Sequence, residues 1–391
     1  MTDIARGLQG VVLTQTRLSR VEGEAGRLTI AGFPLEDLAP NADYEEVIHL
    51  LWFDRLPTRP ELGALRAKMA ASRDLPAPTL AVLQAAAKAK LPPMDGLRMG
   101  VDTLSLVDPN PSDISPQANL ARAEGLVARV PSIVAGYWRL LHGQAPVPPR
   151  PDLTHAGNFL YMMTGEEPHP AAVRGLETYL NTVVDHGMNA STFTARVIVS
   201  TRSDMISAIV GAIGALKGPL HGGAPGPALD TVFKLQAQAS QSGRSVGEVA
   251  REWARKTVES GDRIMGFGHR VYKVRDPRAD VLGAAAERLF ERTGDTRLYE
   301  DARVCEDVFV EVLEELKPGR HLRTNVEFYT ALVLHGVGLE PEIFSSIFGM
   351  ARVGGWTAHV LEQIQDDVLI RPRAEYNGPM DRKWVPLEER S

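Results

Sequence analysis

The chain has 391 residues, of which 44% are hydrophobic and 24% are charged, a composition typical of a globular protein with room for two domains. The formal net charge of -6 argues against nucleic acid as the main partner, because nucleic-acid-binding surfaces need an excess of cations. A single cysteine, Cys305, excludes an intrachain disulfide. We therefore expect neither a nucleic-acid partner nor a disulfide framework.

The N-terminus lacks the basic start and the long apolar stretch of a signal peptide. The longest mildly apolar run, Ala208–Leu216, is too short to cross a bilayer. These two features predict a cytoplasmic protein without a membrane partner.

Strand signals are scarce and lie near the N-terminus. Residues 27–32 are the best candidate strand, and we expect them to pair with residues 10–14 in a small sheet. Helical periodicity dominates the rest of the chain. Val304, Val308 and Val312 recur every four residues, and a second apolar face runs from Ile343 to Ile364. The pattern predicts an almost all-α fold with a minor N-terminal β-hairpin.

Three local contexts carry candidate chemistry, around His221, His269 and Glu327. Residues 217–325 begin and end beside two of these candidates. We expect this segment to form a smaller domain that closes over a large domain made of residues 1–216 and 326–391. Two imidazoles and one carboxylate can together polarise a carbonyl group and remove a proton from the carbon beside it.

His221 lies in Gly218-Pro219-Leu220-His221-Gly222-Gly223-Ala224, which holds too many helix breakers for a helix interior. Its glycines allow close approach of the backbone to a ligand. A helix N-terminus nearby would favour a neutral imidazole that donates to an enolate oxygen. On pattern alone, a histidine in a flexible turn is the more ordinary interpretation, and it stays ahead of the functional one.

His269 follows a tight turn, Gly266-Phe267-Gly268, and four cations follow it closely: Arg270, Lys273, Arg275 and Arg278. Such a density of cations suits an anionic ligand, although a solvated basic face is the alternative. His186 lies beside Gly187 and small polar residues, where a capped turn or a buried histidine is as plausible. A zinc site from His186, His221 and His269 is disfavoured, since no pair has the short spacing of zinc motifs.

Two arginines near the C-terminus stand out. Arg352 interrupts an otherwise apolar helical stretch, where a charge has to be paired or functional. Arg371 lies in Leu369-Ile370-Arg371-Pro372-Arg373. A structural ion pair is the ordinary alternative for both arginines.

Together, the contexts of His221, His269 and Glu327, with the N-terminal and C-terminal segments, make the chain resemble the citrate synthase family over essentially its whole length. The resemblance implies an all-α homodimer with a large and a small domain. It implies condensation of acetyl-CoA with oxaloacetate to citrate and CoA. Acetyl-CoA is then a co-substrate, and no metal or prosthetic group is expected.

The resemblance also implies a role for individual residues. His221 matches the residue that stabilises the acetyl enol, Glu327 the base, and His269 the residue that polarises the oxaloacetate carbonyl. His186, Arg278 and Arg352 match residues that hold oxaloacetate, and Arg371 matches an arginine lent to the partner subunit's site. The implied CoA contacts are Asp262, Arg263, Ile264, Met265, Gly266, Lys273 and Asn325.

Glu327 departs from the commonest form of the family, which has Asp there, and it resembles a subgroup with Asn-Val-Glu-Phe at residues 325–328. The added methylene matters because a shift of about 1 Å in a catalytic group can cost ~100-fold in rate. Two other functions stay open: 2-methylcitrate synthesis from propionyl-CoA, and a catalytically weak paralogue that only binds CoA esters or oxaloacetate. A single methyl group shifts discrimination by only about 1–3 kcal/mol.

Overall fold

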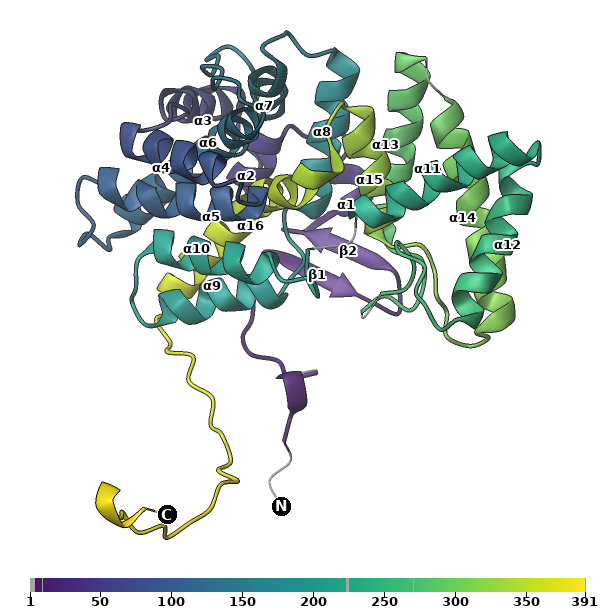
Figure 1. The fold of residues 1–391 in the computed structure, drawn as a ribbon. Helices are drawn as coiled ribbons and strands as arrows, with labels where there is room; N and C mark the ends of the chain where they lie inside the picture. Colours follow the sequence, from purple (N-terminus) through teal and green to yellow (C-terminus); the bar gives the residue numbers. More distant parts are fainter. Residues whose placement is uncertain (1–3, 9, 223–224, 270, 295, 391) are drawn as a thin grey trace.

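The computed structural model describes residues 4–8, 10–222, 225–269, 271–294 and 296–390, and its regular structure is almost entirely α-helical (Figure 1). The all-α prediction is confirmed. Within the described ranges, the one sheet has three short antiparallel strands, β1 (Ser19–Glu22), β2 (Arg27–Ile30) and β3 (Phe33–Pro34).

The predicted partner of the second strand is wrong. Ser19 pairs with Ile30 and Glu22 with Arg27, so β2 pairs with the segment directly before it and not with residues 10–14. A tight turn closes this hairpin at Gly26, whose φ of +62° suits glycine. Because the loop is short, this local pairing loses less conformational entropy than a pairing that must close a longer loop.

The larger part of the molecule is a helical body on the left and centre of Figure 1. Polar caps start many of its helices; Thr154 and Asn189, for example, accept hydrogen bonds from the first turns of α7 and α9. The helices of this body and one 3₁₀ turn are α1 (Leu35–Leu38), α2 (Tyr44–Phe53), α3 (Arg59–Ala71), α4 (Ala77–Lys88), α5 (Pro93–Asp102), η2 (Thr103–Val107), α6 (Pro116–Leu141), α7 (His155–Thr164), α8 (Pro170–Val183), α9 (Ala190–Ser200) and α10 (Met205–Leu216).

Helix α16 (Phe344–Asp366) runs through the centre of this body and contacts α6, α8, α9 and α10. It is buried nearly all round, mostly through apolar side chains, of which Ile347, Trp356 and Val360 are fully buried. A helix surrounded by other helices needs such a surface. The predicted apolar face of residues 343–364 is therefore confirmed.

Five helices lie on the other side of the molecule: α11 (Pro225–Ser242), α12 (Val246–Glu259), α13 (Pro277–Thr293), α14 (Arg297–Leu316) and α15 (Val326–Gly336). A second hydrophobic cluster, separate from the main core, lies entirely within residues 217–325 and includes Val249, Phe309 and Val312. Helix α13 instead joins the main core through Ala279 and Leu282. The domain boundaries at 216/217 and 325/326 stay a prediction.

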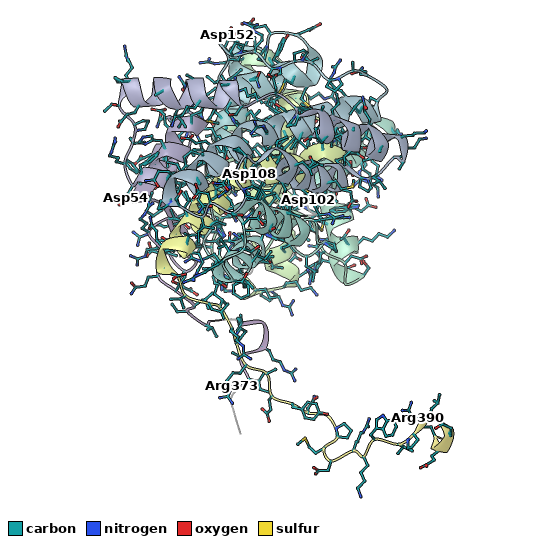
Figure 2. The ribbon with its side chains drawn as sticks, turned by 90° about the vertical axis from the view of Figure 1, so that its left-hand side faces the viewer. Asp54, Asp102, Asp108, Asp152, Arg373 and Arg390 are labelled. Carbon is teal, nitrogen blue, oxygen red and sulfur yellow. The ribbon has the colours of Figure 1, made fainter. Side chains whose placement is uncertain are left out.

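After α16 the chain leaves the body as an extended tail, residues 368–390, which Figure 2 shows with Arg373 and Arg390 along it. Large apolar side chains on the tail are exposed, with Trp384 at 78% and Met380 at 72%. Short 3₁₀ turns complete the structure: η1 (Arg6–Leu8), η3 (Pro341–Ile343) and η4 (Leu387–Glu389). Among the described helices, none is long and apolar enough to cross a membrane.

Candidate active site

Glu327 lies in the first turn of α15. Asn325 caps this helix, and its Oδ1 accepts a hydrogen bond from the Glu327 amide at 3.0 Å. Burial raises the pKa of Glu327 to about 7; Asp276 raises it further, while Arg278 and Arg352 oppose both effects. A carboxyl with this pKa can take a proton and release it again near neutral pH.

His221 lies in the turn after α10, where its amide donates to the Gly218 carbonyl at 2.9 Å. Its Nε2 is 2.8 Å from Ser191 Oγ on α9, and its ring meets Phe348 of α16 edge-on. Burial, with the charge of Arg352, lowers the pKa of His221 to about 4. The ring is therefore neutral at pH 7 and carries one N–H.

The loop before His269 needs glycine for two reasons. Gly266 has a φ of +87°, and a Cβ there would lie 3.0 Å from Cβ of Phe328 on α15. This close approach holds the loop against the segment before α15, where the Asn325 amide donates to the Gly266 carbonyl at 2.9 Å. The loop that leads to His269 is thereby held against the start of the helix that carries Glu327.

The His269 ring is oriented by backbone amides. Its Nδ1 accepts from the amides of Val271 and Tyr272, both at 3.1 Å. Burial and Arg278 lower the pKa of His269 to about 4, so the ring is neutral, and its proton is then on Nε2. Nε2 lies 3.3 Å from Nη2 of Arg278. Two N–H groups that lie this close together, one on each side chain, need an acceptor that both can share, such as a ligand oxygen.

His186 completes a cluster of aromatic rings. Its Nε2 is 3.1 Å from the Tyr272 hydroxyl, and its ring centroid is 5.8 Å from that of His269. Burial, followed by the charges of Arg278 and Arg352, lowers the pKa of His186 well below its ordinary value. His186 therefore also acts as a neutral hydrogen-bonding group.

Arg278 is buried in the first turn of α13. Asp276, the cap of that helix, binds its Nε at 3.0 Å and its Nη2 at 2.8 Å. Asp276 is itself 1% exposed and also accepts from the Val326 amide at 3.3 Å. One carboxylate therefore joins the arginine to the start of the helix that carries Glu327.

Arg352 is 2% exposed in the middle of α16. Its Nε donates to the Val183 carbonyl at 2.8 Å, and its Cζ lies 4.7 Å from the centre of the Phe348 ring. Among the described residues, nothing accepts a hydrogen bond from its buried Nη1. Burial lowers the pKa of Arg352 to about 10, so it is still charged at neutral pH. A buried cation with an unused donor is suited to an anionic ligand.

The structure thus brings six predicted residues into one electrostatic cluster. The charge of Arg352 acts on the pKa values of His186, His221 and Glu327, and that of Arg278 acts on His269. Arg371 does not join them within this chain, because it lies exposed on the tail. Gly223, Ala224 and Arg270, from the two histidine contexts, lie outside the described residues.

The predicted CoA contacts lie at the edge of this cluster, and they differ in how exposed their side chains are. Asp262, Arg263 and Met265 are exposed in the loop after α12, whereas Ile264 is 4% exposed and packs in the second core. Lys273 is exposed, and its amide donates to the Gly23 carbonyl at 3.2 Å. Asn325 uses its side-chain amide to donate to the Gly268 carbonyl at 2.8 Å. The side chains of Ile264 and Asn325 therefore already have structural roles.

Three residues of the site were not singled out from the sequence: Ser191, Tyr272 and Asp276. Asp276 carried a usable signal, since Asp followed by Pro is a typical start of a helix. Ser191 and Tyr272 carried none, because their contacts with His221 and His186 join segments distant in the chain.

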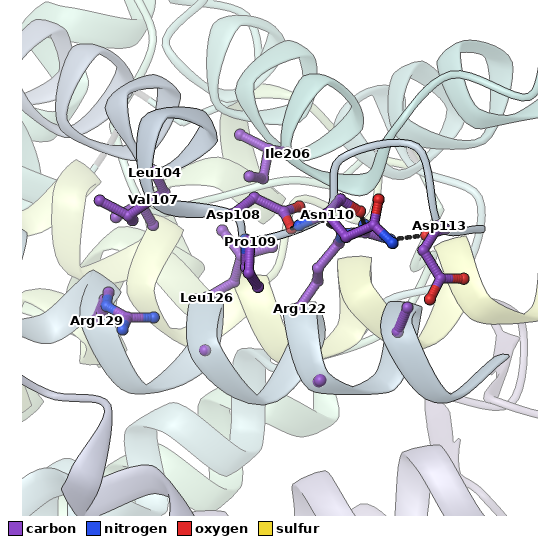
Figure 3. A pocket seen from close by; sticks show the side chains of 13 residues that line it. Leu104, Val107, Asp108, Pro109, Asn110, Asp113, Arg122, Leu126, Arg129 and Ile206 are labelled. Carbon is purple, nitrogen blue, oxygen red and sulfur yellow. Dashed lines mark hydrogen bonds and ion pairs between the residues drawn. The ribbon is translucent and has the colours of Figure 1, made fainter. Parts of the chain in front are cut away.

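Two further observations bear on the site. The described part of the chain contains no group of three or more His, Cys, Asp or Glu residues arranged to hold a metal ion. A cavity of about 290 Å³ lies between η2 and α6, lined by residues such as Val107, Arg122 and Arg129 (Figure 3). None of the candidate residues lines that cavity, so we do not assign it to the reaction.

The comparisons with known proteins agree with one another. The family profile described as citrate synthase, C-terminal domain, matches residues 7–373. Citrate synthase 2 of Bacillus subtilis is 42% identical over 388 residues, which are 99% of each chain. The 2-methylcitrate synthase of Mycobacterium tuberculosis is 38% identical over 384 residues, covering 97% of this chain and 92% of that one.

Solved structures extend the similarity to the fold. Citrate synthase from Pyrobaculum aerophilum matches with a TM-score of 0.87 at 38% identity, covering 99% of this chain and 95% of that chain. Citrate synthase from Thermoplasma acidophilum, solved as a ternary complex with carboxymethyl coenzyme A and oxaloacetate, also has a TM-score of 0.87. It is 29% identical and covers 99% of this chain and 100% of that chain.

The fold and the cluster define an almost all-α acyltransferase that combines acid–base groups with buried cations for an anionic substrate. With a family profile over residues 7–373 and relatives matched over nearly their full length, the chain belongs to the citrate synthase family.

Proposed function

We propose that the protein condenses acetyl-CoA with oxaloacetate and water to give citrate and CoA. One observation carries the proposal: Glu327, a carboxyl with a pKa of about 7, lies in one cluster with buried Arg278 and Arg352 and with neutral histidines. This combination suits the removal of a weakly acidic proton beside a bound dianion. The Thermoplasma acidophilum relative, solved with a CoA analogue and oxaloacetate, supports the substrate class.

Enolisation is the first step. Glu327 takes a proton from the acetyl methyl group, and His221 donates a hydrogen bond to the thioester oxygen as negative charge develops there. Ser191 contacts Nε2 of His221 at 2.8 Å, which leaves Nδ1 for the substrate. The Ser191 hydroxyl has one proton and two acceptors within reach, Asn189 Oδ1 at 2.7 Å and Nε2 of His221 at 2.8 Å. In the reaction we propose that it donates to Nε2, which places the proton of the neutral ring on Nδ1, where the enol needs it.

Oxaloacetate supplies hydrogen-bond acceptors for the donors of His269 and Arg352 that lack an acceptor in the described part of the protein. Its carbonyl oxygen accepts from Nε2 of His269, which resolves the contact between that nitrogen and Arg278. Its carboxylates bind Arg278, Arg352 and His186, and Nη1 of Arg352 acquires an acceptor. The enolate carbon then attacks the polarised carbonyl carbon, and the carbonyl oxygen takes the proton of His269 Nε2 and becomes the hydroxyl group of citryl-CoA. The proton that Glu327 took from the methyl group restores the neutral ring through solvent.

Hydrolysis completes the reaction, as water attacks the citryl thioester, the carbon–sulfur bond breaks, and the thiol of CoA leaves with a proton. For CoA itself we propose the loop of Asp262, Arg263, Ile264, Met265 and Gly266, together with Lys273 and Asn325. The side chains of this chain supply a base, a donor and the cations, so we propose that no resident metal or prosthetic group is required.

We further propose a homodimer in which Arg371 reaches the site of the partner subunit. Two features of the tail support this arrangement. Arg371 is exposed in its own chain, and Tyr376, Met380 and Trp384 beyond it are 69%, 72% and 78% exposed. Apolar side chains of this size need a covering surface, and a second copy of the chain provides one. The cytoplasmic location stays a prediction.

Two alternatives have their own support. The similarity to a 2-methylcitrate synthase keeps propionyl-CoA as a second acyl donor. The replacement of Asp by Glu327 motivates the binding paralogue, while the presence of both histidines and both buried arginines in one cluster argues against it.

The test is oxaloacetate-dependent CoA release from the purified protein, measured with acetyl-CoA and with propionyl-CoA. A higher kcat/KM with acetyl-CoA is the expected result. A preference for propionyl-CoA would move the assignment to 2-methylcitrate synthesis. If a folded dimer released no CoA with either thioester, only the binding paralogue would stand.

A further inference from the structure

Glu306 on α14 is a buried carboxylate that the reaction outlined above does not use. It is 2% exposed, and its pKa lies below the ordinary value: burial alone raises it, but hydrogen bonds from Arg275, Thr324 and Tyr329 together outweigh that effect. An ionised carboxylate in the interior is expensive unless several donors surround it. Packing alone therefore does not explain why an ionised carboxylate is buried at this position.

The partners of Glu306 belong to the two segments that carry the predicted chemistry. Its Oε1 accepts from Nη1 of Arg275, which lies between His269 and Arg278 in the sequence. Its Oε2 accepts from the hydroxyl of Tyr329, two residues after Glu327 on α15. A single carboxylate thus holds the oxaloacetate-binding loop on one side and the helix of the base on the other.

Additional contacts make this junction rigid. Arg275 also donates to Thr324 Oγ1 at 3.2 Å, and its Cζ lies 5.8 Å from the centre of the Tyr329 ring. The Tyr329 hydroxyl accepts from Nη1 of Arg303 at 3.2 Å. Thr324 itself is 1% exposed and directly precedes the Asn325 cap of α15. No described contact joins Glu306 to Glu327, His269 or Arg278.

We propose that Glu306 is a positioning residue, which fixes the placement of Glu327 relative to His269 and Arg278 through Arg275 and Tyr329. This inference rests on the proposed function, because it assigns Glu306 a task in that reaction. Proton removal and attack on the carbonyl group require the base and the oxaloacetate-binding residues to be held at fixed positions relative to each other. A misplacement of about 1 Å can cost ~100-fold in rate. The longer side chain of Glu327 makes such a constraint more important.

The test compares Glu306→Gln with Glu311→Gln, a change at an exposed ion pair on the same helix. For Glu306→Gln we expect kcat to fall about 10- to 100-fold, with the KM for oxaloacetate within about threefold of the unmodified value. The pH midpoint of kcat/KM should stay in place, because Glu306 is not among the groups that shift the pKa of Glu327. Glu311→Gln should retain full activity.

Tyr329→Phe removes one hydrogen-bond partner of Glu306 and keeps the aromatic ring. It is the second test variant, to be used if Glu306→Gln does not fold. Its kcat should also fall, and where both variants fold, the double variant should lose less than the product of the two single losses. An unchanged kcat in a folded Glu306→Gln or Tyr329→Phe protein, or a moved pH midpoint, would overturn the assignment. Failure of the proposed function is distinguishable, since the unmodified protein would then release no CoA.

Discussion

The rings of His186 and His269 meet nearly edge to face, with centroids 5.8 Å apart, although they lie on loops widely separated in the chain. Tyr272 contacts both rings, with centroids 5.6 Å from His186 and 5.0 Å from His269. Each histidine is neutral because burial and nearby arginines oppose its protonation. The site therefore combines fixed cations with neutral hydrogen-bond donors, and its one predicted base is Glu327.

The rate should depend on the ionisation of Glu327. A protonated carboxyl cannot take a proton from acetyl-CoA, so kcat/KM should fall as the pH drops through the pKa of about 7 and level off above it. Initial rates of CoA release between pH 5.5 and 9 test this expectation. The pH profile of Glu327→Gln, at its residual rate, should lack that midpoint; a retained midpoint would assign it to another group.

Shortening the side chain of the proposed base should also lower the rate. In Glu327→Asp the carboxyl withdraws by about one methylene, and the loop around Gly266 cannot follow easily because it packs on Phe328. We expect kcat to fall ~100-fold with little change in the KM for oxaloacetate. A gain in activity would instead indicate a decayed enzyme, and it would favour the binding paralogue.

Ser191 should affect the rate through His221, and its hydroxyl also contacts Asn189 Oδ1 at 2.7 Å and Trp356 Nε1 at 3.1 Å. In Ser191→Ala, Nε2 of His221 loses its partner at 2.8 Å and the ring is free to change tautomer. We expect kcat to fall about tenfold while the KM for oxaloacetate is maintained, a modest part of the effect of losing an oxyanion donor outright. Steady-state kinetics beside Thr194→Ala, on the same helix, provide the comparison. Equal rates in both variants would exclude the role.

Arg352 should be needed for the substrate more than for the fold. Lysine keeps the charge but cannot donate to the Val183 carbonyl and present a second N–H in the same geometry. For Arg352→Lys we expect the KM for oxaloacetate to rise at least tenfold. The exposed Arg251→Lys is the matched control. An unchanged KM in a folded Arg352→Lys protein would remove Arg352 from the substrate site.

Stability should depend on pH through Glu177, a buried carboxyl on α8. Burial, then Glu45 and Asp43, raise its pKa from 4.5 to about 8. As the pH rises between these values, the unfolded chain has lost this proton while the folded chain retains it, so the free energy of unfolding falls across that window. Gln does not titrate, so Glu177→Gln should be more stable at high pH, relative to the unmodified protein, by on the order of 4 kcal/mol.

Thermal unfolding at pH 5 and at pH 8.5 measures this effect. The difference in Tm between Glu177→Gln and the unmodified protein should widen toward pH 8.5. Glu167→Gln, at an exposed ion pair, should show no such trend. A constant difference across this range would contradict the raised pKa of Glu177.

Helix periodicity predicted the fold class well, because a buried helix face is recorded in residues three and four apart. Val308 and Val312 lie buried on α14, whereas Val304 of the same predicted pattern is 42% exposed, and the apolar run from residue 343 forms α16. The N-terminal pairing was predicted wrongly, because a strand pattern in residues 27–30 does not show which segment pairs with them, and the short turn that ends at Gly26 selects the segment directly before.

The sequence by itself determined the helices, the local contexts of His221, His269 and Glu327, and through them the family. Only the tertiary structure decided which groups are neutral, which donor of Arg352 is unused, and how Glu306 joins Arg275 to Tyr329. The reason is physical: propensity and periodicity act over a few residues, whereas burial, pKa and hydrogen-bond partners depend on segments that meet only after folding.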